Sequence, residues 1–363
     1  MQNTYHPQTV TPPKDFLIEA LEEHNIGSKE FAIRTGKPEK TISALLNGKS
    51  SITPEMAIQF EKVLRIPAHF WLEIQRLYDE CEARIAFQKN LEESQDWAKK
   101  FPYSNMAKLG WVKTTRKASE KVAELLTYFG VASEKAWNDC YFDKKLKVSL
   151  RASLEDVKHA HALTAWLRHG QLQAQKIDAP VYSKSKFKKQ LNQAKELMFL
   201  QPSDFFQQLQ QLCLQAGVIV VYSPSLPSVP IHGATRWNNN IPLIQLTGRY
   251  KQNDIFWFTF FHEAGHILEH SKKYISLENI SYKGADQQFE EEADNIAIKY
   301  TFSTEQEAKF LALGSLEDKV IESFAQENRI HPAIIVGRLQ HKNLIAFKEK
   351  RHFFVRIDLE NPK

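Results

Sequence analysis

The sequence predicts a mainly helical protein with a small α+β domain. Long stretches carry apolar residues at helical spacing, and runs rich in Val and Ile that are typical of strands begin only after residue 217. The composition also changes near residue 201. We therefore expect a five-helix bundle in residues 1–85, a helical, basic middle region in residues 86–200, and a third domain with a small sheet in residues 201–363.

The overall composition is that of a water-soluble globular protein. Hydrophobic residues make up 42% of the 363 residues and charged residues 25%. No apolar run approaches the length of a membrane-spanning helix, and the first residues lack the pattern of a signal peptide. Three widely spaced cysteines suit a reducing compartment. We expect a cytoplasmic protein with no membrane partner.

The net charge of +5 is unevenly distributed along the chain. Residues 1–80 carry a net charge of −2, residues 81–200 of +9, and residues 201–363 again of −2. Basic surfaces attract phosphate backbones, although a solvated helical surface explains such a surplus equally well. The middle region could be a second contact to nucleic acid, a dimerisation region or a lid.

Five helices are expected between residues 13 and 84. The first follows two prolines, the second has Ser28 as its N-cap and stops at Gly36, and the third ends at Gly48. The fourth has Thr53 as its N-cap and Pro54 at its first position. A longer amphipathic helix follows. In the middle region the clearest helices are expected in residues 119–131 and 154–175.

The second and third helices form a helix-turn-helix pattern. Gly36 lies in the turn between them, small Ala32 suits a close helix crossing, and Ile42 and Leu45 face inward. A plain helical bundle is the alternative. The segment resembles the Cro and lambda-repressor type of DNA-binding domain, and most closely the HigA antitoxin branch, through residues 52–79.

This resemblance implies a set of residues that contact a double-stranded DNA operator. Lys29 and Asn47 would meet phosphates. The residues facing base edges would be Glu39, Lys40, Thr41, Ser43 and Ala44. Pro38 stands where this branch often has a capping serine. Because the domain is slightly negative, we expect either a homodimer, which adds the phosphate contacts of two half-sites, or additional contacts from the basic middle region.

The elements expected after residue 200 alternate between helix and strand. Helices are predicted in residues 200–217, 254–270 and 287–302, with a short helical pair in 317–340. Strands are predicted at both ends of 217–237, where a Pro-rich loop lies between them, in 241–248, and in the aromatic-rich segment 351–358.

Residues 262–266, HEAGH, carry the spacing of a zinc site. His262 and His266 are one helical turn apart, so their imidazoles lie on one side of the helix and can bind one Zn²⁺. Glu263 would lie beside the metal, where a carboxylate can take a proton from water and pass it to a leaving amine. The alternative is a pair of surface or core histidines.

A third ligand is expected from the acidic helix downstream. Glu290 and Asp294 share one helical face, and we expect Glu290 to be the ligand and Asp294 to hold a ligand histidine by its other ring nitrogen. Glu291 and Glu292 are competing candidates, and an acidic, solvated helix start is the alternative. We interpret His270 as flanking rather than ligating.

Residues 217–300, with GVIVV, PLIQLTG, WFTFFHEAGHILEH and ExxADxxA, resemble the ImmA/IrrE family of zinc metallopeptidases. The resemblance implies a zincin-like metallopeptidase domain with a small sheet. It also implies zinc ligands His262, His266 and Glu290, and catalytic Glu263. The second helix continues as IKYTFS, without the Leu-Met-Pro ending common in the family.

Together, the two resemblances imply a DNA-binding transcriptional regulator that cleaves a repressor or antitoxin-like protein, as in stress responses and toxin–antitoxin loci. The alternative is a DNA-binding antitoxin or repressor whose metallopeptidase fold is a non-catalytic sensing or docking module. Four residues are candidates for stabilising an oxyanion: His232, Tyr274, Tyr300 and His331.

Overall fold

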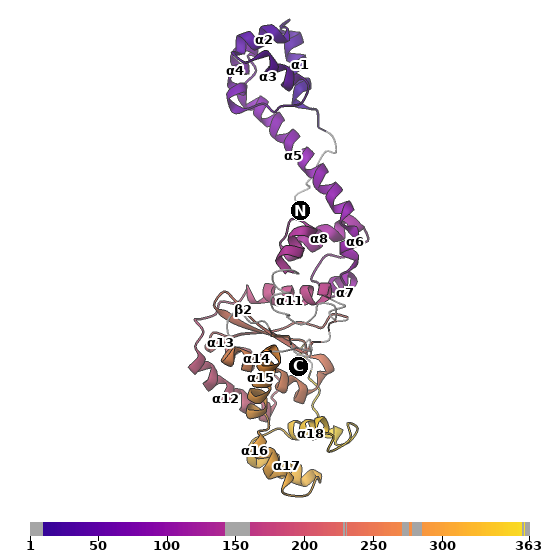
Figure 1. Ribbon diagram of the computed structural model, residues 1–363, viewed down its shortest axis with the longest axis vertical. Coiled ribbons are helices and arrows are strands. Elements are labelled where there is room, and N and C mark those ends of the chain that lie inside the picture. Colours follow the sequence, from indigo (N-terminus) through magenta and orange to yellow (C-terminus); the bar gives the residue numbers. More distant parts are fainter. Residues whose placement is uncertain are drawn as a thin grey trace. The chain divides into compact units, whose positions relative to one another are not determined.

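The protein is described by a computed structural model that covers residues 10–141, 160–227, 229, 231–270, 276–277, 285–357 and 359. The chain forms two compact units, Met1–Gln95 and Asp96–Lys363, each of which is treated by itself (Figure 1). It is mainly helical with one small sheet, as the sequence predicts. The division into three domains at residues 85 and 200 stays a prediction. In the described parts of the chain, no helix combines the length and the apolar character needed to span a bilayer.

The first unit contains the five expected helices. They are α1 (Pro13–Glu23), α2 (Ser28–Thr35), α3 (Glu39–Leu46), α4 (Pro54–Leu64) and α5 (Ala68–Glu93). Their apolar faces meet in one core, where the ring of Phe60 lies 4.9 Å from that of Phe31 and 5.8 Å from that of Trp71. All three rings are fully buried, so this core fixes how α2, α4 and α5 pack.

The helix ends confirm one predicted cap and correct another. The Thr53 hydroxyl accepts from the Met56 backbone N–H at 3.3 Å, with Pro54 at the first helical position. The prediction that Ser28 is the N-cap of α2 is wrong. Gly27 is the N-cap, because its carbonyl already accepts the first helical hydrogen bond, from the N–H of Phe31.

Helices make up the first half of the second unit. They are α6 (Gln95–Lys99), α7 (Tyr103–Lys108), α8 (Ala118–Phe129), α9 (Glu134–Trp137), α11 (Ala160–Ala174), α12 (Lys184–Leu200) and α13 (Phe205–Gln215). The helices predicted in residues 119–131 and 200–217 correspond to α8 and α13. Of the helix predicted in residues 154–175, the part from Ala160 is confirmed as α11, and residues 154–159 lie outside the described residues.

A four-stranded sheet with the order β1-β3-β2-β4 lies in this unit. The strands are β1 (Ile219–Tyr222), β2 (Gly233–Asn238), β3 (Ile241–Leu246) and β4 (Ser276–Leu277). β1 pairs with β3 in parallel, and β2 pairs with both β3 and β4 in antiparallel. Asn239 and Asn240 form the tight turn between β2 and β3, where Asn239 takes a positive φ of 55° that asparagine tolerates.

Alternating strand residues cover the two faces of the sheet. Leu243 joins Ala174 of α11 in a small core cluster, whereas Ile244 and Leu246 join the main core beside α14 (Asn253–Glu269). The sheet therefore lies between α11 and α14 (Figure 1). The Thr235 hydroxyl of β2 donates to the Glu263 carbonyl at 3.0 Å, which ties the middle of α14 to the sheet.

The remaining elements surround α14. They are η3 (Arg249–Lys251), α15 (Ala285–Tyr300), α16 (Thr304–Leu311), α17 (Asp318–Asn328), α18 (Pro332–His341) and η4 (Arg351–Phe353). The strand predicted in residues 351–358 is wrong. This segment forms η4 and one isolated bridge between Arg356 and Gln252. Phe353 and Ile357 are buried, whereas Val355 between them is exposed, although on a strand all three side chains would share one face.

The close packing of α14 on α15 depends on Gly265. A Cβ atom added there would lie 2.9 Å from Cα and 3.1 Å from the carbonyl oxygen of Ala293. Both of these are backbone atoms, so the two helices could not keep their separation. α14 and α15 therefore approach each other through a glycine and an alanine.

We predict that Gly265→Ala lowers the free energy of unfolding of this unit by about 1–3 kcal/mol, the usual cost of overpacking, despite the better helix propensity of alanine. Urea denaturation followed by tryptophan fluorescence measures the change. The matched control is Asn295→Ala on the exposed side of α15, which we expect to leave stability unchanged or slightly raised. Equal stability of Gly265→Ala and wild type would contradict the packing argument.

Candidate functional site

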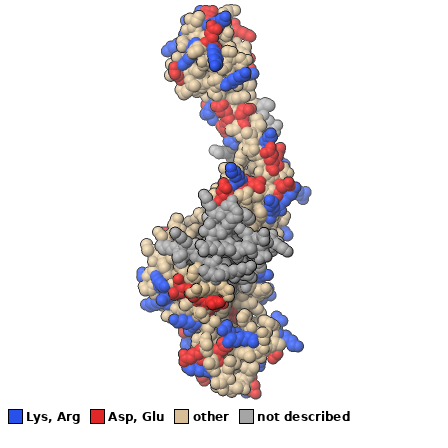
Figure 2. All heavy atoms as spheres, viewed as in Figure 1, with Lys and Arg blue, Asp and Glu red and all other residues tan. Residues whose placement is uncertain are grey.

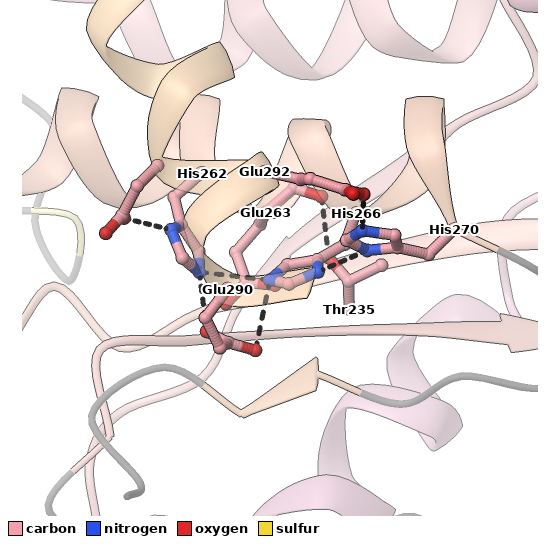
Figure 3. A network of polar contacts seen from close by, with 8 residues as sticks. Thr235, His262, Glu263, His266, His270, Glu290 and Glu292 are labelled. Carbon is pink, nitrogen blue, oxygen red and sulfur yellow. Dashed lines mark hydrogen bonds and ion pairs between the residues drawn. The ribbon is translucent and has the colours of Figure 1, made fainter. Parts of the chain in front are cut away.

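Two histidines of α14 lie buried on one face of that helix. His262 is 3% exposed and His266 2%. They occupy successive turns, as the four-residue spacing requires, and their Nε2 atoms lie 3.0 Å apart (Figure 3). Burial, and then the neighbouring His262 and His270, lower the pKa of His266 well below its usual value. A neutral imidazole is the form that binds a metal.

Glu290 of α15 completes a group of three donor atoms. Its Oε2 lies 3.2 Å from Nε2 of His262, and its Oε1 lies 3.6 Å from Nε2 of His266. The ligand atoms of the three residues all lie within 4.8 Å of one another. Tetrahedral Zn²⁺ with bonds of about 2.0–2.1 Å requires donor atoms about 3.3 Å apart. The two nitrogens and the carboxylate therefore fit zinc in both chemistry and spacing.

Asp294 supports this group from one turn further along α15. Its Oδ1 lies 2.8 Å from Nδ1 of His262. A carboxylate in that position accepts the Nδ1 proton and leaves Nε2 as the free lone pair. The structure thus brings His262, His266 and Glu290 together (Figure 3). Asp294, the fourth residue predicted for the metal site, contacts His262.

The two competing glutamates lie elsewhere. Glu291 is exposed and accepts from the Gln287 amide at 3.3 Å. Glu292 points to His270, whose Nε2 lies 3.1 Å from Glu292 Oε2. His270 itself follows the end of α14, with extended backbone, and its Nδ1 lies 2.8 Å from Nδ1 of His266. It touches a candidate ligand without joining the three donor atoms.

Glu263 lies between the histidines and the sheet. It is fully buried, and its carboxylate passes close to Gly233 at the start of β2. A Cβ atom at Gly233 would lie 2.9 Å from Oε1 of Glu263 and 2.8 Å from the Thr259 methyl group. Only glycine leaves room for this carboxylate. Gly233 is not among the predicted site residues, although a glycine at the start of a predicted strand can signal a close approach.

The oxyanion candidates are separated by the structure. His232 precedes Gly233, so it lies at the end of β2 that borders Glu263. Its ring is 5.3 Å from that of Tyr250, and burial, together with Arg249, lowers its pKa to about 4. His232 thus stays a candidate.

The other candidates lie away from the donor atoms or outside the described residues. The ring of Tyr300 stacks on Phe261 in the core, at 5.3 Å. His331 lies 3.2 Å from the amide of Asn253, at the start of α14, which is about 14 Å of helix rise from His262. Neither residue belongs to the site. Tyr274 lies outside the described residues.

The first unit exposes the residues expected to contact DNA. Ile42 and Leu45 of α3 are buried, as predicted, and the opposite face of α3 is open to solvent. The candidates Lys29, Glu39, Lys40, Ser43 and Asn47 are exposed, and Thr41 and Ala44 are partly exposed.

Other features of the unit affect how this face could bind. The Asn47 amide donates to the Ser43 carbonyl at 2.7 Å, which caps the end of α3. Pro38 is the N-cap of α3 and makes no side-chain capping bond. Acidic and basic side chains are mixed over the visible face of the unit (Figure 2). A single unit thus offers individual contacts rather than a uniformly basic surface.

Asp254 lies at the other end of α14 and is a second carboxylate of this helix that is withdrawn in part from water. Its Oδ1 is buried and has no hydrogen-bond partner among the described residues. Burial raises the pKa of Asp254 to about 6, although the backbone N–H groups of the first helical turn oppose the shift. Its charge therefore costs stability at neutral pH.

Comparisons with known proteins recognise part of the chain. Residues 17–71 match the helix-turn-helix family. An uncharacterised HTH-type transcriptional regulator of Escherichia coli, YddM, is 36% identical over 83 residues, which are 23% of this chain and 84% of that protein.

Two solved structures also match. A putative antidote protein of a plasmid maintenance system from Nostoc punctiforme is 27% identical, with 23% of this chain and 92% of that chain covered and a TM-score of 0.23. An addiction module antidote protein of the HigA family from Coxiella burnetii is 28% identical, with 23% and 91% covered and a TM-score of 0.22.

The raised pKa of Asp254 predicts a pH-dependent stability. Between its unfolded pKa near 4 and its folded pKa of about 6, the folded protein binds more protons, so stability falls as the pH rises through this window. We expect Asp254→Asn to remove up to about 3 kcal/mol of this loss, which is two pKa units at 1.36 kcal/mol each. Urea denaturation at pH 4.5 and 7.5 tests it. A wild-type-to-variant difference that is the same at both pH values would contradict the prediction.

Proposed function

Because the chain belongs, through residues 17–71, to the helix-turn-helix family of transcriptional regulators, we propose that it binds an operator through α3 and cleaves a protein partner at a zinc site on α14 and α15. The observation that carries the second half is the group of three donor atoms with Glu263 beside it. His262 Nε2 lies 3.0 Å from His266 Nε2 and 3.2 Å from Glu290 Oε2. This spacing supports a site for one metal ion.

The donor set favours zinc over the harder cations. Two imidazoles and one carboxylate are typical ligands of catalytic zinc, whereas Ca²⁺ and Mg²⁺ prefer oxygen. His262, His266 and Glu290 would hold the ion, and Asp294 would fix the ring of His262. When bound, Zn²⁺ supplies Lewis acidity, which makes a neighbouring water molecule acidic and polarises a peptide carbonyl.

Glu263 is the residue that would move the proton. Its carboxylate would accept a proton from water during attack on the peptide and return it to the nitrogen of the leaving amine. The hydrogen bond from Thr235 to the Glu263 carbonyl fixes the backbone of this residue, and Gly233 leaves room for its side chain. A carboxylate that is oriented before the substrate arrives needs no reorganisation during the reaction.

The proposed substrate is a protein that regulates genes. The resemblance of residues 217–300 to ImmA/IrrE metallopeptidases supports a zincin-like endopeptidase that acts on a repressor or an antitoxin-like regulator. The DNA-binding unit on the same chain also supports it, because a protease tethered near an operator meets regulators bound there at a high effective concentration.

Operator binding is proposed to require two copies of the chain. Residues 1–80 carry a net charge of −2, so one unit gains little from nonspecific attraction to phosphates. A homodimer doubles the phosphate contacts and reads two half-sites through paired α3 helices. Lys40 extends from the first turn of α3 and is exposed, which suits a contact with a base edge.

For the enzymatic half, we predict that wild type binds one zinc ion per chain and that Glu263→Gln keeps the zinc but cleaves about 10²–10⁴-fold more slowly. Bound zinc is measured by elemental analysis. Cleavage is measured by incubation with the protein products of neighbouring genes. Glu291→Gln, an exposed change on α15, is the matched control and should cleave normally. Zinc binding without any cleavage by wild type would favour the alternative, an antitoxin or repressor whose second unit senses or docks.

For the DNA half, we predict that Lys40→Ala weakens binding by about 1–3 kcal/mol and relaxes base preference at one position of an operator selected from random duplexes. Fluorescence anisotropy at two salt concentrations measures the affinity. The same titration with duplexes that differ from the operator at one base pair measures the base preference. Lys89→Ala, an exposed change on α5, is the control. Unchanged affinity and base preference of Lys40→Ala would contradict base recognition by this residue.

A further inference from the structure

We propose that His270 and Glu292 act as a positioning pair that orients His266 and fixes its tautomer, so that its Nε2 is available to the metal. This inference rests on the proposed zinc site. The two residues lie outside the three donor atoms, yet they form a continuous chain of polar contacts that ends on one of them (Figure 3).

The imidazole rings of His266 and His270 contact each other. Nδ1 of His266 and Nδ1 of His270 lie 2.8 Å apart, a hydrogen-bonding distance. Neither ring nitrogen can both donate and accept, so one of the two must carry the proton and the other must offer a lone pair. The direction of this bond decides which nitrogen of His266 is protonated.

The surroundings of His266 Nε2 decide the direction of this hydrogen bond. This atom faces Nε2 of His262 at 3.0 Å and Oε1 of Glu290 at 3.6 Å, so it is the atom that would bind the metal. A metal-binding Nε2 must be deprotonated, which puts the proton of the neutral ring on Nδ1. His266 Nδ1–H therefore donates to Nδ1 of His270.

The contact between His270 and Glu292 fixes the tautomer of His270. Once Nδ1 of His270 accepts, the proton of its neutral ring lies on Nε2, 3.1 Å from Oε2 of Glu292. A carboxylate is the group that accepts such a proton. The contacts thus define one consistent set of tautomers, in which Glu292 orients His270 and His270 orients His266.

The surroundings hold this pair in place. The His270 side chain is only 2% exposed, its ring lies 4.5 Å from that of Phe289, and its backbone N–H donates to the His266 carbonyl at 3.1 Å. The second oxygen of Glu292 accepts from the Gln288 amide at 3.0 Å. Both members are therefore restrained from more than one side.

The pair makes the two ligand histidines unlike each other. His262 is supported directly by the carboxylate of Asp294, at 2.8 Å, whereas His266 reaches its carboxylate through a second imidazole. Without His270, the buried N–H of His266 would lose the acceptor that lies 2.8 Å away, and such a loss is costly away from water. His270 thus has a role even though it binds no metal.

The test uses full-length protein stripped of metal and measures zinc affinity by competition with a chromophoric chelator. His270→Leu removes the acceptor at similar size, whereas His270→Asn puts an amide oxygen near the position of Nδ1. We expect His270→Leu to weaken zinc binding about 10- to 100-fold and His270→Asn to recover most of that loss. Glu292→Leu should weaken binding in the same direction, and Glu292→Gln, which keeps an acceptor, should stay near wild type.

A second measurement separates positioning from ligation and from folding. With Co²⁺ in place of zinc, we expect His270→Asn to keep the absorption bands of wild type, because the ligand set is unchanged. Different coordination bands in that variant would overturn the proposal and make His270 a ligand. Equal weakening by His270→Leu and His270→Asn, at unchanged thermal stability of the metal-free proteins, would also overturn it.

Zinc binding by wild type distinguishes a failure of the proposed metal site from a failure of the positioning pair. If wild type binds zinc and His270→Leu binds it equally well, the positioning pair fails and the metal site stands. If wild type binds no zinc, the proposed metal site fails and the positioning pair fails with it. Glu291→Gln, which changes an exposed acid on the same helix, should match wild type throughout.

Discussion

The close contact between Gly265 of α14 and Ala293 of α15 is the constraint on which the candidate site depends. Among the described residues, the contacts between the donor atoms and their supports run between these two helices and the residue that follows α14, from His262–Asp294 to His270–Glu292. Helices usually pack at 8–10 Å between axes, and small residues at the contact allow the shorter separations. Carboxylates as short as Asp294 can then reach an imidazole on the neighbouring helix. A side chain at position 265 would push apart both the metal donors and their supports.

The sheet supplies the second constraint, because it fixes α14 from the opposite side. Thr235 bonds to the carbonyl of Glu263, and Gly233 leaves the space that its carboxylate fills. Glu263 is therefore positioned by β2, whereas the histidines on the same helix are positioned by α15. The two roles proposed for the site, metal binding and proton transfer, thus depend on different neighbours. Substitutions in β2 and in α15 should affect them separately.

Several correct predictions depend on local periodicity alone. The shared face of His262 and His266, the cap at Thr53 and the buried side of α3 follow from helix geometry alone. The choice among Glu290, Glu291 and Glu292 does not, because it depends on how α15 is rotated against α14. The pairing of His270 with Glu292 depends in addition on α14 ending at Glu269. In residues 351–358, aromatic content suggested a strand, but the segment begins as η4 and leaves Val355 exposed between the buried Phe353 and Ile357.

α14 carries two acidic side chains, Glu263 and Asp254, that lower the stability of the folded protein. Its aromatic residues, among them Trp257, Phe260 and Phe261, are fully buried and would suit a plain core helix. Yet the same helix buries Glu263 completely, and it buries Asp254 in part, at a raised pKa. Each buried carboxylate costs free energy that an apolar residue would not. The surrounding aromatic core offsets that cost. A helix selected only for packing would carry neither acid, and the complete burial of Glu263 beside the histidines supports the proton-transfer role proposed for it.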